Sequence, residues 1–115
     1  MRRKDIKKIT EDLKQLIKAE LLNNFKNHKG YVVDSVEFVN IMNFKTDDEN
    51  EDRDKIIVTI VYAESRVWVK FIEDSKSSDN ITLRNNKPIE FIYKNETDEF
   101  EITTRDVIFF INSPY

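Results

Sequence analysis

The stretch that most constrains this fold is the run IIVTIVYAESRVWVKFI, from Ile56 to Ile72. It is β-branched or aromatic almost throughout and contains neither Gly nor Pro, which predicts a long β-strand. Its seventeen residues at about 3.3 Å each would extend about 56 Å. A compact domain of this size has a radius of gyration of only about 13 Å. The strand is therefore expected to bend or to break.

The spacing of large side chains within this run indicates where the bend lies. The bulkier side chains are even-numbered up to Tyr62, whereas the aliphatic side chains are odd-numbered from Val67 onward. A shift of one residue moves a whole set of side chains to the opposite face of a sheet, and a β-bulge is the usual cause. The pattern predicts a bulge or a sharp bend at Glu64–Ser65.

Length and composition limit the classes of protein that this chain can belong to. Its 115 residues suit a single domain spanning residues 1–115, which can bury about 65% of its unfolded surface. Cysteine is absent, which excludes a disulfide framework and a thiolate metal site. With no secretory signal and no run of about 20 apolar residues, we expect a cytoplasmic protein. The net charge of −3 argues against nucleic acid as the main partner.

One amphipathic helix is predicted over residues 5–27. Apolar residues recur there at three- and four-residue steps and form a single stripe. The only glycine, Gly30, follows the basic residues at the end of this pattern, where a left-handed residue commonly closes a helix. The stripe consists of Ile6, Ile9, Leu13, Leu16, Ile17 and Leu21.

Antiparallel strands are predicted over residues 32–111. The helix has one stripe to bury and the sheet has one face to cover, so the two are expected to pack together. The predicted fold is α+β, with one N-terminal amphipathic helix packed on a curved four- or five-stranded antiparallel β-sheet meander. Beside the central run, the expected strands are 32–44, a short edge strand at 81–84, 89–94 and 100–111, separated by polar loops at 47–54 and 73–80 and a turn at 95–99.

Three short motifs accompany this element order. They are His28-Lys29-Gly30 after the helix, Val67-Trp68-Val69 in the long strand and Phe91-Ile92-Tyr93 in a later strand. The order resembles the cystatin-like and NTF2-like superfold, and the motifs resemble Tim44-like domains over residues 21–111. The resemblance implies a protein-docking or membrane-peripheral role rather than catalysis. Those families carry two or three helices and this chain has room for one, which argues against a deep ligand pocket.

The acidic loop comes closest to a metal-binding motif. Asp48, Asn50 and Asp52 stand at the first, third and fifth positions of a calcium loop. However, Arg53 occupies the sixth position, where Gly is needed, and Thr59 the twelfth, where a bidentate Glu is needed. We interpret the segment as a solvated loop, and we predict no metal site and no cofactor.

Titratable residues leave a second hypothesis open. His28 is the only histidine and fits a cation at the end of the helix better than a general base, because no nucleophile or carboxylate is placed beside it. Carboxylates in or beside the predicted strands would have perturbed pKa values if they faced inward, as in a small-molecule-binding or enzymatic pocket. We expect them on the solvated face. They are Asp34, Glu37, Glu64 and Asp106.

Basic residues at the start of the predicted helix raise a third hypothesis. An anionic membrane surface attracts a helix that combines such a cluster with an apolar stripe, and this would make the chain a peripheral membrane-binding module. The competing interpretation is that the stripe packs on the sheet and the cations are merely solvated. The cluster consists of Arg2, Arg3, Lys4, Lys7 and Lys8.

The leading hypothesis is a non-catalytic protein-interaction module that docks a protein partner or a second copy through an exposed sheet face. If Val67 and Val69 face the helix, Trp68 and its even-numbered neighbours face away from it. A Trp flanked by cations has the composition of a binding hot spot, and a large apolar cluster is unusual on a monomer. The alternative is that a second bulge or the C-terminal residues cover this cluster. The predicted contact residues are Arg66, Trp68, Lys70, Ile72, Ile92, Ile108 and Phe110.

Overall fold

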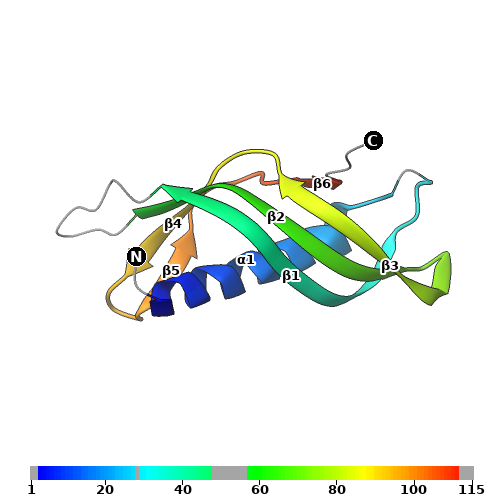
Figure 1. The fold of residues 1–115 in the computed structure, drawn as a ribbon, viewed down its shortest axis with the longest axis horizontal. Helices are drawn as coiled ribbons and strands as arrows, with labels where there is room; N and C mark the ends of the chain where they lie inside the picture. Colours follow the sequence, from blue (N-terminus) through cyan, green and yellow to red (C-terminus); the bar gives the residue numbers. More distant parts are fainter. Residues whose placement is uncertain (1–2, 28, 48–56, 112–115) are drawn as a thin grey trace.

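A computed structural model of the protein describes residues 3–27, 29–47 and 57–111 (Figure 1). The strands form one six-stranded sheet, antiparallel in each described pairing, and the helix packs against it. The predicted α+β class is therefore confirmed, with six strands in place of the expected four or five. The elements are α1 (Arg3–Asn24), β1 (Val33–Asp47), β2 (Ile57–Phe71), β3 (Asp74–Asn85), β4 (Ile89–Lys94), β5 (Glu99–Ile102) and β6 (Phe109–Ile111). The expected meander is wrong, because β4 pairs with β2 and β6 pairs with β3 rather than each with the strand before it.

β2 is the central strand, and three other strands pair with it. One edge of β2 pairs with β1 from Thr59 to Phe71. The other edge pairs with β4 over residues 57–60 and then with β3 over residues 64–71. β5 extends the sheet beyond β4, and β6 extends it beyond β3. The molecule measures 50 × 30 × 24 Å, and its long axis accommodates a strand that a more spherical domain would not.

In β2 the buried side chains switch from even-numbered to odd-numbered positions, as its sequence pattern predicts. The switch lies three residues earlier than predicted. Val58 and Ile60 are buried, whereas the odd-numbered residues are buried from Ala63 onward. Tyr62 and Ile60 lie opposite consecutive residues of β1, so Val61 is the extra residue of β2. This is the arrangement of a β-bulge, which also bends the strand.

The bulge or sharp bend predicted at Glu64–Ser65 lies on the neighbouring strand rather than on β2. The register does shift there, but the extra residue is Met42 of β1. The side-chain pattern of one strand reports a change of phase without reporting which strand of a pair carries the extra residue. Two bulges on opposite strands, at Val61 and Met42, therefore lie close together and give the sheet its curvature.

A buried asparagine connects the strands where β2 changes neighbours. Asn85 is 5% exposed and is the last residue of β3. It lies beside the part of β2, residues 61–63, that pairs with neither β3 nor β4. The backbone N–H of Ala63 donates to Asn85 Oδ1 at 2.8 Å. Asn85 Nδ2 donates to the carbonyl oxygens of Lys87 at 2.7 Å and Val61 at 3.5 Å. The side chain thus replaces the strand that β2 lacks at this point.

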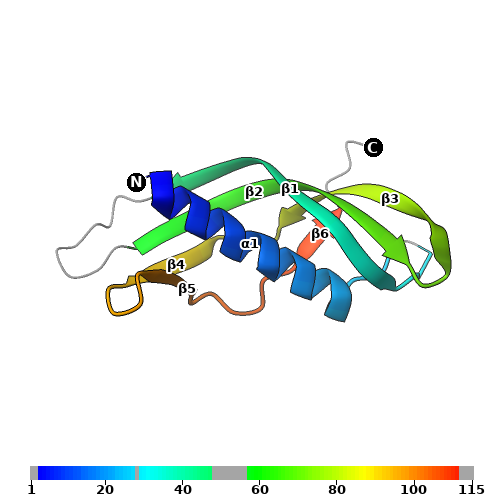
Figure 2. The ribbon, with the colours of Figure 1, turned by 90° about the horizontal axis from the view of Figure 1, so that it is seen from below.

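α1 lies beneath the sheet, and β1 and β2 curve over it (Figures 1 and 2). Ile9, Leu13, Ile17 and Leu21 recur at four-residue steps and are at most 1% exposed. Ile6, the first residue of the predicted stripe, is 37% exposed instead, because Asp5, which is 3% exposed, continues the four-residue steps toward the start of the helix. The stripe packs into one core with the inward side chains of the sheet, including Val39, Val58, Val67, Val69, Phe91 and Phe109.

The helix ends at Asn24, three residues earlier than predicted. The chain then turns at Asn27, whose Oδ1 accepts hydrogen bonds from the backbone N–H groups of Lys29 and Tyr31, both at 2.9 Å. Gly30 has φ +79°, the left-handed conformation expected of it. It closes this turn rather than the helix.

Two strand predictions need correction. The segment 73–80, expected to be a polar loop, forms the turn at 72–73 and most of β3. Asp79 and Asn80 lie opposite Val69 and Trp68 of β2, because a ladder is held by backbone hydrogen bonds that polar residues also make. The predicted strand 100–111 is divided into β5 and β6, which pair with different neighbours.

Candidate functional site

The face of the sheet that is turned away from α1 has an aromatic pair at its centre. Phe38 of β1 lies opposite Trp68 of β2, with the ring centroids 5.4 Å apart and the planes tilted by 59°. Trp68 is half-buried, whereas Phe38 is 57% exposed. We call this side of β1, β2 and β3 the outer face. Its residues include Phe38, Asn40, Lys45, Tyr62, Glu64, Arg66, Trp68, Lys70, Thr82 and Arg84.

Two arginines on the outer face make no ion pair with a described carboxylate. Arg66 is exposed and stands between Asn40 of β1 and Thr82 of β3. The Arg84 guanidinium carbon lies 5.0 Å from the centroid of the Tyr62 ring, within the range of a cation–π contact. Neither guanidinium is in an ion pair with a described carboxylate, although Glu64 lies opposite Arg84 in the register of β2 and β3. Both arginines lie near aromatic rings, a combination that favours an anionic partner.

Lys70, in contrast, is held by an acidic neighbour. Its Nζ lies 3.3 Å from Glu37 Oε1, and Ser78 Oγ donates to Glu37 Oε2 at 2.5 Å. The hydrogen bonds from Ser78 and Lys70, followed by the charge of Lys70, lower the pKa of Glu37. This contact connects β1 to β3 across β2 and fixes the end of the outer face beyond Trp68.

The structure brings together part of the predicted contact set. Arg66, Trp68 and Lys70 alternate along the same side of β2, as the period of two required. Phe110 is 45% exposed and lies opposite Arg84 at the margin of the outer face. Ile72 is 59% exposed but belongs to the turn after β2.

The other two predicted contact residues lie outside this group. Ile92 pairs with Ile57, which is eleven residues from Trp68 along β2, or about 36 Å. Ile108 is 53% exposed, precedes β6 and lines a groove between β6 and α1. Alternation within each strand predicted that Ile92 and Ile108 share a side of the sheet with Trp68. The order of the strands, which alternation does not give, sets their distance from Trp68.

Sequence reasoning missed Phe38, the most exposed aromatic side chain of the site. Regular alternation in the first strand places Phe38 on the same face as Val36, which packs against the core. Instead, Val36 and Phe38 lie opposite consecutive residues of β2, so Glu37 is an extra residue and Phe38 emerges on the outer face. No residue in this stretch signals such a bulge, because none of them requires a special backbone conformation.

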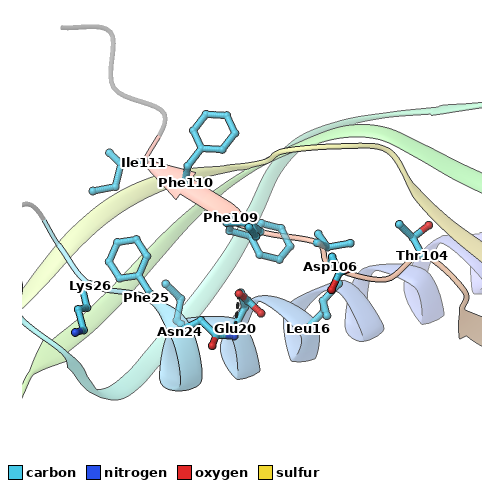
Figure 3. A pocket seen from close by; sticks show the side chains of 13 residues that line it. Leu16, Glu20, Asn24, Phe25, Lys26, Thr104, Asp106, Phe109, Phe110 and Ile111 are labelled. Atoms are coloured by element: carbon cyan, nitrogen blue, oxygen red, sulfur yellow. Dashed lines mark hydrogen bonds between the residues drawn. The ribbon is translucent and has the colours of Figure 1, made fainter.

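The groove between α1 and β6 is the second candidate feature (Figure 3). It has a volume of about 820 Å³. Phe109 points from β6 toward the helix, whereas Phe110 points away from it (Figure 3). Beside these aromatic residues, the lining includes Leu16, Glu20, Asn24, Phe25, Lys26 and Ile111.

The basic cluster at the N-terminus is partly engaged within the fold. Lys8 Nζ lies 2.9 Å from Asp98 Oδ2 and also donates to the Asp98 carbonyl oxygen, so it is held by the turn between β4 and β5. Lys7 is exposed. Arg2 and the side chains of Arg3 and Lys4 lie outside what the structure describes. No helix among the described residues is long and apolar enough to cross a membrane.

A shallow hollow of about 480 Å³ lies between the start of α1 and β5. Asp12 is on its lining together with Glu11 and Glu99. Burial, followed by the charges of Glu99 and Glu11, raises the pKa of Asp12. Lys7, Lys8 and Phe100 complete the lining.

The strand carboxylates considered for an inward pocket do not converge. Asp34, Glu37 and Asp106 are exposed, and Glu64 is half-buried on the outer face. Within residues 3–27, 29–47 and 57–111, no group of three or more His, Cys, Asp or Glu side chains is arranged to hold a metal ion. His28 and residues 48–56 of the acidic loop lie outside the described residues.

Comparison with known proteins adds no assignment. No family model, curated protein or solved structure matches this chain. Its function therefore has to be inferred from the chemistry of the outer face and the groove.

Proposed function

We propose that this chain is a non-catalytic interaction module whose outer face binds an acidic segment of a protein partner. The observation that carries the proposal is the Phe38–Trp68 pair, in which an exposed ring packs against the tryptophan at 5.4 Å between centroids. Arg66, with no ion pair among the described residues, is next to it on the same side of β2. An aromatic anchor beside an available arginine is the composition that dominates binding energy in protein interfaces.

The charge balance of the outer face favours an acidic partner over a second copy. Among the side chains of this face that the structure describes, cations outnumber carboxylates, although the whole chain carries −3. A two-fold contact of this face with itself would bring like charges together, which is unfavourable. The cations are Lys45, Arg66, Lys70 and Arg84, and the carboxylates are Glu37 and Glu64.

The resemblance to the cystatin-like and NTF2-like superfold is part of the same proposal. What supports it is the position of the N-terminal helix beneath a curved antiparallel sheet (Figure 2), whereas those families carry more than one helix. Apolar side chains of α1 and the sheet pack into one core between these two layers, and the groove at β6 lies beside this core and is partly open. This arrangement favours binding on the surface over binding in an internal pocket. A cytoplasmic location is also proposed, in keeping with the absence of cysteine.

Trp68 gives a direct test, because it is the only tryptophan. We would titrate the protein with a panel of acidic peptides that contain an aromatic residue and follow the fluorescence of Trp68. Binding should shift the emission, weaken with salt and be reduced by at least about tenfold in Arg66→Glu and in Phe38→Ser. Lys18→Glu is the matched control, because it reverses an exposed charge on α1, away from the outer face.

Two outcomes would contradict the proposal. Equal losses in Arg66→Glu and Lys18→Glu would mean that only net charge matters. A single-stranded oligonucleotide that binds more tightly than every peptide in the panel would make nucleic acid the partner, because bases also stack on exposed aromatic rings.

A further inference from the structure

Of the sheet edges in the described part of the chain, β6 is the one without charged residues or irregularities. β5 carries Glu99 and Glu101, and the part of β3 beyond β6 is rich in charged and polar residues. The register of β1 shifts four times along its length. β6 has the sequence Phe-Phe-Ile. Charges and bulges are among the features that prevent edge strands from pairing with another chain, and β6 has neither, although its three residues make it short.

The hydrogen bonds of β6 determine which backbone groups face its free edge. The Asn86 N–H donates to the Ile108 carbonyl at 2.9 Å, and the Ile108 N–H donates to Asn86 Oδ1 at 2.9 Å. Hydrogen-bonded and non-bonded pairs alternate in an antiparallel ladder, so the next bonded pair is Phe110 with Arg84. Phe109 and Ile111 therefore direct their N–H and C=O groups toward the free edge.

The groove beside this edge is the surface that an additional strand would cover. Its apolar lining includes Leu16 and Phe25 from the α1 side and Phe109 from β6. Ile111 is 39% exposed at the open end of β6. A strand hydrogen-bonded to β6 would lie about 4.8 Å beyond it, which is over the groove.

We propose that β6 pairs antiparallel with β6 of a second copy of this chain, about a two-fold axis at Phe110. In this register Phe109 of each copy lies opposite Ile111 of the other, and each of these two pairs exchanges N–H···O bonds in both directions. The Phe110 rings of the two copies meet on one side of the joined sheet as a close cross-strand pair. Phe109 and Ile111 meet on the other side, over the two grooves.

Self-complementarity identifies the occupant as a second copy rather than an unrelated peptide. All side chains of the edge are apolar, so the edge matches itself without an unpaired charge. The two-fold axis is perpendicular to the sheet and keeps both α1 helices on the same side of it. The charged lining of the groove carries both signs, with Glu20 and Asp106 against Lys26, so in the proposed antiparallel arrangement Lys26 of one copy is available to Glu20 of the other.

A proline substitution tests the free edge specifically. Ile111→Pro removes an N–H that faces the free edge. This N–H donates no hydrogen bond to β3, so the pairing of β6 with β3 is kept. Sedimentation equilibrium should find the native chain dimeric at about 50 μM and the dissociation constant of Ile111→Pro raised at least about tenfold. Ile102→Pro is the matched control. Thr103 is bonded to Glu90, so the N–H of Ile102 faces the free edge of β5, and this variant should dimerise like the native chain.

Further variants keep the proposal open to contradiction if Ile111→Pro fails to fold. Phe110→Lys places two cations beside the axis and should give a folded monomer, as judged by circular dichroism. Glu20→Lys and Lys26→Glu should each weaken the dimer, and the double variant should restore it. A native chain that is monomeric at about 50 μM, or a dimer that persists in Phe110→Lys, would overturn the proposal. A dimer lost only in Arg66→Glu would instead assign self-association to the outer face.

Discussion

Asn85 shows how one side chain allows a strand to change neighbours. On the edge opposite β1, β2 pairs with β4 up to residue 60 and with β3 from residue 64. Between these residues that edge has no partner among the described strands. Asn85 has one acceptor and two donor hydrogens in a fixed plane, which matches an N–H and two carbonyl oxygens. An aspartate of the same size lacks the donors, and a leucine lacks both functions.

We therefore expect Asn85→Ala to be strongly destabilising. The substitution leaves the buried N–H of Ala63 without a partner and removes the donor to Val61 and Lys87. An unsatisfied buried group costs about 1–3 kcal/mol, so urea denaturation should show a loss of about 2–4 kcal/mol. Asn80→Ala is the control, since Asn80 is exposed on the same strand, and it should change stability by less than about 0.5 kcal/mol. Similar losses in both variants would contradict this role of Asn85.

At the scale of elements, α1 is matched to the sheet by apolar packing but not by charge. Its buried stripe covers the inner face of the sheet. Near its start, however, Asp12 faces Glu99 of β5 and adjoins Glu11. Among the ion pairs described at this end of the helix, Lys14 pairs with Glu11 at 3.8 Å and Lys8 pairs with Asp98 at 2.9 Å, but neither contact reaches Asp12 or Glu99. The contact between α1 and β5 is thus a place where ionisation opposes folding.

The pH dependence of Asp12→Asn follows from this contact. Folding raises the pKa of Asp12 above 3.8, chiefly through burial and then through Glu99 and Glu11. The charged form of Asp12 therefore lowers the free energy of unfolding. The loss is complete above the folded-state pKa and disappears below 3.8, where Asp12 is protonated in both the folded and the unfolded state. Asp12→Asn should be more stable than the native chain at pH 7, and the difference in unfolding free energy should shrink as the pH falls toward 3.8. A difference that grows on acidification would contradict the sign.

At the scale of the whole molecule, β2 holds two parts of the sheet together. Its first residues pair with β4, which carries β5, and its later residues pair with β3, which carries β6. β1 runs along both parts on the opposite edge. The strands with partners on both sides are therefore in the middle, and β5 and β6 are short edge strands. Local opening is expected to begin at these margins.

Native-state hydrogen exchange should report this order. Val67 and Val69 are fully buried in the part of β2 that has neighbours on both edges, so their amides should be among the slowest to exchange. Amides of β5 should exchange faster by at least about a hundredfold, because that strand has one neighbour. Equal protection of β5 and the centre of β2, measured by NMR, would show instead that the sheet opens only as a whole.

Local patterns in the sequence were sufficient for several features. The stripe of α1 and the grouping of Arg66, Trp68 and Lys70 follow from periods of 3.6 and 2, which depend on backbone geometry alone. The left-handed Gly30 also follows from its lack of a side chain. These features need no knowledge of which strands are neighbours.

Only the tertiary structure decided the rest, because strand pairing is a long-range property. Residues 74–80 joined β3 because β2 supplied backbone partners to polar residues. Phe38 reached the outer face because β1 gained an extra residue at Glu37 relative to β2. Asn85 was buried because β3 ends at this residue, beside the part of β2 that lacks a strand partner on the edge opposite β1 and bonds to the Asn85 side chain instead. In each case a backbone hydrogen bond to a distant segment set the position, and no side-chain pattern within one strand records its partner.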